Sequence, residues 1–304
     1  ELLNDGFDHE VVSAAEIAGA IQSEHQSGNI YVEHERVYLT FERTCEVEAA
    51  KRLVSMLLSD PIPKVHNLDD EIKETEAKIG QTLAPSQRNA VKLCLENRCA
   101  IMTGGPGVGK TTTLRAILDI YHRLYPDNEL LLAAPTGKAS RRMTEQTGFP
   151  AFTLHSAMGI SSEENLEDPV PEFLSADFVV IDEYSMVDMK VTYALFQRLK
   201  PGVQILFVGD PDQLPSVGAG NVLRELLRCG VIPTAVLDTV FRQASNSRIY
   251  LNAYAVNNND THLQFGDDFA LYEADSSDAA AALVIQAYLS EVKKKGIESV
   301  QILS

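Results

Sequence analysis

Cys99-Ala-Ile-Met-Thr-Gly-Gly-Pro-Gly-Val-Gly-Lys-Thr-Thr-Thr113 is an apolar run that breaks into a glycine-rich loop and then continues as a helical segment. The range Gly104–Thr111 satisfies the pattern G-x-x-x-x-G-K-[ST], whose backbone N–H groups surround the phosphates of a nucleotide. Glycine permits the positive φ angles and the close approach that a Cβ atom would block, and we expect both at Gly105, Gly107 and Gly109. The stretch therefore predicts a phosphate-binding loop between a strand and a helix.

The loop also predicts the groups that would hold ATP and Mg²⁺. A helix from Thr111 to Tyr121 would aim its positive N-terminal end at the phosphates. Lys110 would reach the β- and γ-phosphates, and the Thr111 hydroxyl would bind Mg²⁺. The nucleotide-binding residues expected from the motif are Gly104, Gly105, Pro106, Gly107, Val108, Gly109, Lys110, Thr111 and Thr112.

The composition is that of a globular protein. With 304 residues, of which 45% are apolar and 23% charged, the chain can bury one large core or two moderate ones. No apolar run approaches the roughly 20 residues of a membrane span, and the N-terminus has no basic region followed by an apolar stretch. The four cysteines form no CxxC pair, so neither a zinc site nor a disulfide framework is indicated. We expect a cytoplasmic protein with no membrane partner.

The net charge of −17 argues against a nucleic-acid partner, whose phosphates favour Lys and Arg. Its distribution weakens that argument, because residues 81–150, which contain the phosphate loop, form the only net-positive segment. Local basicity there could serve ATP, a nucleic acid or both. The charge therefore does not decide between these partners.

Residues 1–65 are interpreted as a small winged-helix-like module. A capping box at Ser13 starts a first helix. A hairpin over 30–39 follows, and Thr44 is expected to cap a helix over 45–58. Because the segment is acidic, a structural or partner-binding role is favoured over contact with DNA.

Residues 66–240 show the pattern of a parallel sheet covered by helices. Short apolar runs alternate with helical patterns, which predicts an α/β fold of this kind. Beyond the phosphate loop, the predicted strands are 130–134, 178–181, 204–208 and 234–237. Ligands of such sheets bind at the carboxyl ends of the strands, and polar clusters follow the first three of these strands.

Asp182 and Glu183 follow one of the predicted strands directly. One carboxylate at such a strand end can hold Mg²⁺, while the other orients and deprotonates an attacking water. We assign Asp182 to the metal and Glu183 to the water. A kinase acting on a small molecule would have no evident use for the adjacent general base.

Seven segments together resemble, in order, the first motifs of a superfamily 1 DNA helicase of the bacterial RecD-like type, to which the exodeoxyribonuclease V alpha subunit belongs. The resemblance implies a RecA-like P-loop NTPase domain over 66–240. The segments are Gln87, Gly104–Thr112, Ala134–Met143, Thr153–His155, Asp182–Val187, Gly209–Gly220 and Phe241–Gln243.

The resemblance implies further roles at the nucleotide. Gln87 is similar to the glutamine that reads adenine in this family. Gln213 is similar to the sensor that touches the γ-phosphate and links it to DNA, and Arg242 to the arginine that stabilises charge in the transition state. The alternative for Arg242 is a surface ion pair.

The resemblance also implies DNA contacts. Thr136, Lys138 and His155 fall in motifs that in relatives lie along the single strand. Lys138 could instead be a solvated loop lysine, and His155 a buried, hydrogen-bonded histidine.

The chain departs from its relatives in two places. Residues 159–175, where relatives can carry a strand-separating insertion, contain only a short acidic stretch, so any hairpin there must be small. Residues 241–304 are interpreted as a linker, with a helix over 278–295, and the strand 299–303 as the start of a second RecA-like domain. In motors of this type ATP lies between two such domains, so we expect residues 1–304 alone to be poorly active.

The function expected from the sequence is ATP-driven translocation on single-stranded DNA coupled to duplex unwinding in DNA repair or recombination, with 5′ to 3′ polarity implied by the resemblance alone. The expected partners are single-stranded DNA, duplex junctions and protein subunits of a repair complex. Two alternatives stay open at this point. One is a nucleotide-gated DNA-binding ATPase without unwinding, and the other is a P-loop NTPase or kinase acting on a small molecule.

Overall fold

The computed structural model describes residues 12–160, 172–239 and 247–303. The chain divides into two units, Glu1–Phe241 and Arg242–Ser304. The first unit contains the predicted sheet and the phosphate loop. None of the described helices is long and apolar enough to cross a membrane.

The first unit is built on a six-stranded sheet in the order β5-β4-β6-β7-β3-β8. Every neighbouring pair of strands is parallel, which confirms the predicted α/β fold. The strand predicted over 204–208 continues to Gly209, and the strand predicted over 234–237 ends at Val236. The strands are β3 (Cys99–Thr103), β4 (Leu130–Ala134), β5 (Ala151–Thr153), β6 (Phe178–Ile181), β7 (Gln204–Gly209) and β8 (Thr234–Val236).

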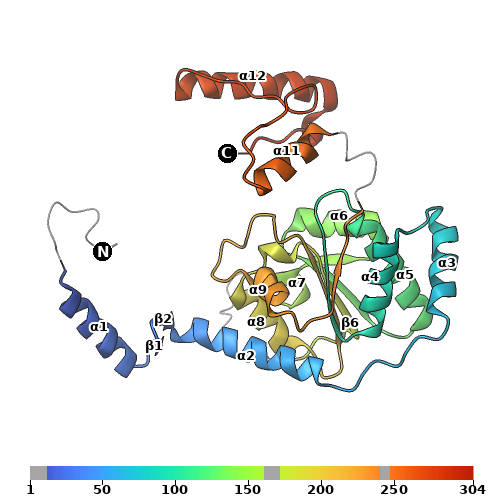
Figure 1. Cartoon of the computed structure of the whole chain (residues 1–304), viewed down its shortest axis with the longest axis horizontal. Coiled ribbons are helices and arrows are strands. Elements are labelled where there is room, and N and C mark those ends of the chain that lie inside the picture. The colour runs from blue at the N-terminus through green and yellow to red at the C-terminus, as the bar shows by residue number, and fades with distance from the viewer. Residues whose placement is uncertain (1–11, 161–171, 240–246, 304) are drawn as a thin grey trace. The chain divides into compact units, whose positions relative to one another are not determined.

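Helices cover both faces of this sheet, and each face has its own apolar cluster (Figure 1). Successive side chains of a strand point to opposite faces. In β3, β6 and β7 the odd-numbered apolar residues join one cluster and the even-numbered ones the other. The even-numbered side packs against α3 (Leu68–Ile79), α4 (Pro85–Glu96), α5 (Lys110–Leu124) and α6 (Gly137–Thr147). The odd-numbered side packs against α2 (Thr40–Leu57), α7 (Leu154–Ala157), α8 (Met189–Arg198) and α9 (Val222–Cys229).

The N-terminal segment joins the sheet through α2. It begins with α1 (Ala14–Gln26), where the predicted capping box at Ser13 is present, and continues with the hairpin β1 (Ile30–Glu33) and β2 (Arg36–Leu39). The prediction that Thr44 caps the next helix was wrong, because α2 already begins at Thr40 and the Thr44 hydroxyl donates to the Thr40 carbonyl inside it. The winged-helix-like character of residues 1–65 stays a prediction.

The second unit contains α11 (Arg248–Asn257), α12 (Ser277–Lys295) and a 3-10 turn, η2 (Ile297–Ser299). The helix predicted over 278–295 is present and starts one residue earlier, because the Ser276 side chain caps it. The strand predicted over 299–303 was wrong, since these residues pair with no strand in the described part of the chain. A strand needs a neighbour to satisfy its backbone N–H and C=O groups.

Candidate nucleotide-binding site

The backbone of the loop after β3 requires glycine at its first position. Gly104 has a φ of 153°, and a Cβ atom there would lie 2.6 Å from the backbone oxygen of Leu237. At the other end of the loop, Gly109 has a φ of 81° and forms the N-cap of α5. The expected positive φ is present at Gly107 and Gly109 but not at Gly105. The loop therefore has the tight shape and exposed backbone that suit a phosphate group.

The side chain of Lys110 folds back across this loop. Its Nζ donates to the carbonyl oxygen of Gly104 at 2.6 Å and to that of Gly105 at 3.0 Å. The ammonium group thus lies over the loop, at the positive N-terminal end of α5. An anion bound by the loop would meet both the helix end and this charge.

The loop forms one wall of a cavity of about 420 Å³. It lies at the carboxyl end of the sheet, because β3 ends in the phosphate loop and β6 ends in the carboxylates. The cavity thereby brings together most of the predicted nucleotide site. Its lining is Gly105, Pro106, Gly107, Gly109, Lys110, Thr111, Thr112, Leu114, Ala139, Arg142, Met143, Gln146, Asp182, Glu183, Val208 and Gln213.

The two carboxylates at the end of β6 are partly buried and close together. Asp182 Oδ1 accepts a hydrogen bond from the Glu183 backbone N–H at 2.9 Å. Burial raises the pKa of Asp182. Burial, and then the Asp182 charge, raise the pKa of Glu183, while the charges of Lys110 and Arg142 oppose both shifts. A carboxylate whose pKa is raised is a better base near neutral pH.

The backbone at Glu183 is also unusual. Its φ of 51° and ψ of 40° place a non-glycine residue in the left-handed region, just before the 3-10 turn η1 (Tyr184–Met186). Such a conformation costs of order 1 kcal/mol and is found mostly where a side chain must be aimed. It turns the Glu183 side chain toward the cavity instead of continuing the direction of β6.

The charge on Asp182 is expected to lower the stability of the fold at neutral pH. A carboxyl whose pKa is higher in the folded than in the unfolded state binds more protons when folded, so stability falls as pH rises through the interval between the two values. Asp182→Asn keeps the acceptor oxygen and removes the charge. We expect it to raise Tm at pH 7, because the buried charge that opposes folding at that pH is gone.

Calorimetry at several pH values checks this expectation. The exposed Asp127→Asn is the matched control and should leave Tm unchanged. The gain in Asp182→Asn should vanish at low pH, where the wild-type carboxyl is itself protonated. A Tm equal to or below that of the wild type at pH 7 would contradict the burial argument.

The residues at this cavity fit Mg²⁺ held together with a nucleotide. The Thr111 hydroxyl and the Asp182 carboxylate both line it, and hard oxygen donors are what Mg²⁺ prefers. In the described part of the chain there is no group of three or more His, Cys, Asp or Glu that could hold a metal ion. A site with one hydroxyl and one carboxylate suits an ion that takes its other ligands from phosphate and water.

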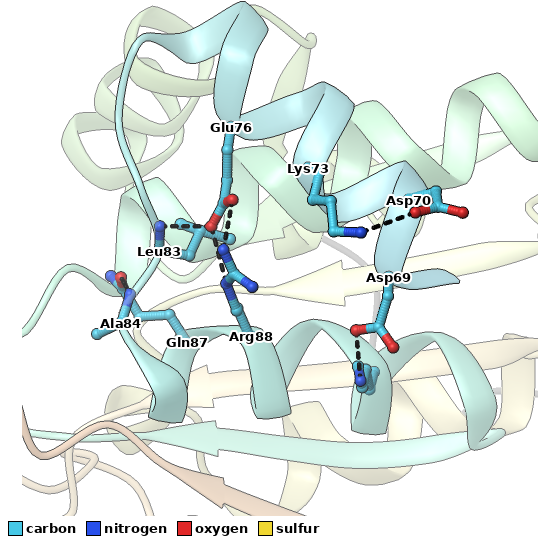
Figure 2. Close-up of polar contacts among 9 residues, drawn as sticks. Asp69, Asp70, Lys73, Glu76, Leu83, Ala84, Gln87 and Arg88 are labelled. Atoms are coloured by element: carbon cyan, nitrogen blue, oxygen red, sulfur yellow. Dashed lines mark hydrogen bonds and ion pairs between the residues drawn. The ribbon is translucent and has the colours of Figure 1, made fainter. Parts of the chain in front are cut away.

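Gln87 lies behind the loop and does not line the cavity. Its side chain is fully buried, with Nε2 donating to the Gly109 carbonyl at 3.3 Å and Oε1 accepting from the Ala84 N–H at 2.9 Å. Figure 2 shows why this turn of α4 is fixed. Glu76 of α3 accepts from the Leu83 N–H at 2.7 Å and from the Arg88 guanidinium at 2.6 and 2.9 Å.

Gln213 lines the cavity from the loop after β7. Asp210 anchors that loop, because its buried carboxylate accepts from the Asp212 N–H at 3.0 Å and lies 3.5 Å from Gln213 Nε2. Arg242 falls outside the described residues, as does the rest of the Phe241–Gln243 segment.

The three residues predicted to contact DNA are all exposed, at or near the carboxyl ends of β4 and β5. The Thr136 hydroxyl accepts from the Ala139 N–H and caps α6. His155 is exposed, so the alternative of a buried histidine was wrong. Thr136 and His155 both line a second hollow of about 210 Å³, which lies beside Val217 of the loop after β7. The structure thus places Thr136 and His155 side by side, with Lys138 in the first turn of α6.

Sequence reasoning missed two residues of α6 that line the nucleotide cavity, Arg142 and Gln146. Their spacing shows that they share one face of the helix, but not that this face lines the cavity. Together with Ala139 and Met143 they recur at intervals of three and four residues, which places them on one face of a helix.

The chain is similar to several known proteins. A family model described as AAA domain matches residues 87–219. The ATP-dependent RecD2 DNA helicase of Deinococcus radiodurans is 34% identical over 224 residues, which cover 73% of this chain and 30% of that relative. The RecBCD enzyme subunit RecD of Mycolicibacterium smegmatis is 35% identical over 164 residues, covering 46% of this chain and 30% of the relative. Among solved structures, the crystal structure of Pif1 helicase from Candida albicans shares 21% identity and a TM-score of 0.46, with 72% of this chain and 55% of that chain covered.

The parallel sheet and its phosphate loop define the class of the first unit as a P-loop NTPase of the RecA-like type. The two relatives are of the RecD type, which confirms the resemblance seen in the motifs over the matched residues. The chain spans 30% of the length of these two relatives.

Proposed function

We propose that this chain is the ATP-binding part of a DNA helicase, in which ATP hydrolysis drives movement on single-stranded DNA and duplex unwinding. The observation that carries the proposal is the convergence of the phosphate loop and two carboxylates on one cavity, with Lys110 and Thr111 on one side and Asp182 and Glu183 on the other. The relatives supply the link to DNA, because they are a DNA helicase and a subunit of the RecBCD enzyme.

In this proposal each residue of the cavity has a separate task. The loop N–H groups and Lys110 bind the phosphates, and Thr111 and Asp182 hold Mg²⁺. Bound Mg²⁺ would neutralise charge on the phosphate oxygens. Glu183 orients a water molecule and takes its proton as the water attacks the γ-phosphorus, whose bond to the β–γ bridging oxygen breaks to release ADP. Gln213 contacts the γ-phosphate.

The adenine-reading role of Gln87 requires that its side chain leave the contacts described above. Both ends of its amide are engaged, one with Ala84 and one with Gly109. The role of Arg242 in the transition state, the domain organisation, the 5′ to 3′ polarity, a cytoplasmic location and partners in DNA repair or recombination are part of the same proposal.

DNA is proposed to cross the carboxyl edge of the sheet at Thr136, Lys138 and His155. If Lys138 contacts a phosphate of the strand, DNA binding releases the counterion of that phosphate. A variant without Lys138 would release one counterion fewer. Lys138→Ala should therefore weaken the binding of single-stranded DNA about equally for all sequences. The negative slope of log K for DNA binding against log salt concentration should become shallower by roughly 1. Fluorescence anisotropy with labelled oligonucleotides at several salt concentrations measures both quantities.

Lys64→Ala, at an exposed lysine outside the helices and strands, is the control and should keep the wild-type slope. Wild-type affinity together with a wild-type slope in Lys138→Ala would remove this residue from the DNA path.

The test of the proposed function itself is ATP turnover with and without single-stranded DNA. Stimulation by the DNA excludes an NTPase or kinase that acts on a small molecule. A strand-displacement assay with opposite single-stranded tails, on a chain extended to the length of the relatives, then separates a helicase from a DNA-binding ATPase that does not unwind. The proposal would be contradicted if single-stranded DNA stimulated ATP turnover in neither the 304-residue chain nor the extended chain.

A further inference from the structure

Helix α6 presents one of its faces to the nucleotide cavity. Ala139, Arg142, Met143 and Gln146 recur with helical spacing, and all four line the cavity. Met143 is 2% exposed and packs in the apolar cluster that also contains α5, so it anchors this face of the helix. The position of Arg142 beside it follows from the helix geometry.

Arg142 is the second positively charged residue, after Lys110, that lines the cavity. Asp182 and Glu183 line the same cavity. Lys110 and Arg142 are the two positive charges that favour the ionised forms of both Asp182 and Glu183. Yet no ion pair within 4 Å holds the Arg142 guanidinium among the residues that the structure describes. Arg142 lines the cavity and is exposed, so its N–H donors are accessible to an anion bound there.

We propose that Arg142 is a phosphate-binding residue that contacts the terminal phosphate of the bound nucleotide from the side of α6. The inference rests on the proposed nucleotide site. A planar guanidinium matches two phosphate oxygens at once, which an ammonium group cannot do. The terminal phosphate is the one concerned, because Arg142 lines the same cavity as Glu183, the residue proposed to orient the water that attacks that phosphate.

Nucleotide affinities of the 304-residue chain test this inference without requiring turnover. A fluorescent, non-hydrolysable ATP analogue and the matching ADP are titrated in the presence of Mg²⁺. In Arg142→Ala we expect the affinity for the ATP analogue to fall about 10- to 100-fold, the worth of a charge-assisted hydrogen bond, while the affinity for ADP changes less than about twofold. Arg142→Lys should restore part of the loss, because it keeps the charge and loses the fork.

Arg141→Ala is the matched control, since Arg141 is the neighbouring arginine on α6, also exposed, that does not line the cavity. Equal losses for the two nucleotides, or no loss in Arg142→Ala, would overturn the assignment to the terminal phosphate. Circular dichroism verifies that each variant is folded.

Lys110→Ala in the same titration separates this inference from the proposed function. If Lys110→Ala abolishes binding and Arg142→Ala behaves as wild type, the nucleotide site stands and only the role of Arg142 fails. If Lys110→Ala binds both nucleotides as the wild type does, the site itself fails and takes the role of Arg142 with it.

Discussion

Lys110→Ala is expected to abolish ATP turnover by this protein and to leave its fold intact. The Lys110 ammonium contacts two carbonyl oxygens of the phosphate loop and has no other hydrogen bond among the described residues. Its removal deletes the charge that would follow the terminal phosphates during transfer, while the core beneath the loop is unchanged. Steady-state release of inorganic phosphate measures the loss, and the thermal unfolding curve measures the fold.

Lys73→Ala is a suitable control, because Lys73 forms an exposed ion pair with Asp70 of the same helix, as Figure 2 shows. It should keep wild-type turnover. Wild-type turnover in Lys110→Ala itself would show that this loop is not the active site.

Glu183→Gln is expected to separate binding from chemistry. Asp182 and Thr111 remain to hold Mg²⁺, so ATP should bind as in the wild type. The base that takes the proton of the water is gone, and hydrolysis should slow by roughly 10²–10⁴-fold, the usual worth of a positioned acid or base. Calorimetry measures the binding, and a single-turnover experiment measures the chemical step.

The pH profile supplies an internal check on Glu183. Burial and the Asp182 charge raise the pKa of Glu183. Its carboxylate therefore becomes protonated, and stops acting as a base, at a higher pH than an ordinary glutamate. Turnover in the wild type should fall on the acid side as pH drops through that raised pKa, and the part of this fall that is due to Glu183 should be missing in Glu183→Gln. Loss of ATP binding in the variant would instead make Glu183 a metal ligand or a structural residue.

Local sequence was sufficient for the parts of this site that depend on neighbours in the chain. The phosphate loop is fixed by a glycine at Gly104 that no side chain could replace and by a helix that starts at Lys110. Asp182 and Glu183 were predictable because a buried apolar strand must end at the sheet edge where ligands bind. The apolar run Phe178–Ile181 was enough to predict the strand, and therefore the position of the two carboxylates that follow it.

The sequence pattern could not predict contacts between elements that lie far apart in the chain. A glutamine on the first turn of a helix is normally solvated, but Gln87 is buried and its Nε2 donates to the Gly109 carbonyl of the phosphate loop, while the Glu76–Arg88 contact ties the same turn to α3. Arg142 was missed because its neighbours Ser140 and Arg141 look equally polar, and only the packing of Met143 tells which side of α6 faces inward. The early start of α2 depended on the hairpin that leads directly into it.

The alternation of side chains in the central strands makes the sheet a partition between two compartments. Val179 and Val180 are adjacent in sequence, yet the first belongs to the cluster with α2 and α8 and the second to the cluster with α4 and α5. A repacking on the α2 side therefore reaches α5 through the backbone of the strands between them, such as β3, β6 and β7. The helix that begins at the phosphate loop is insulated in this way from changes where the N-terminal segment joins the sheet, so the two sides can vary in sequence almost independently.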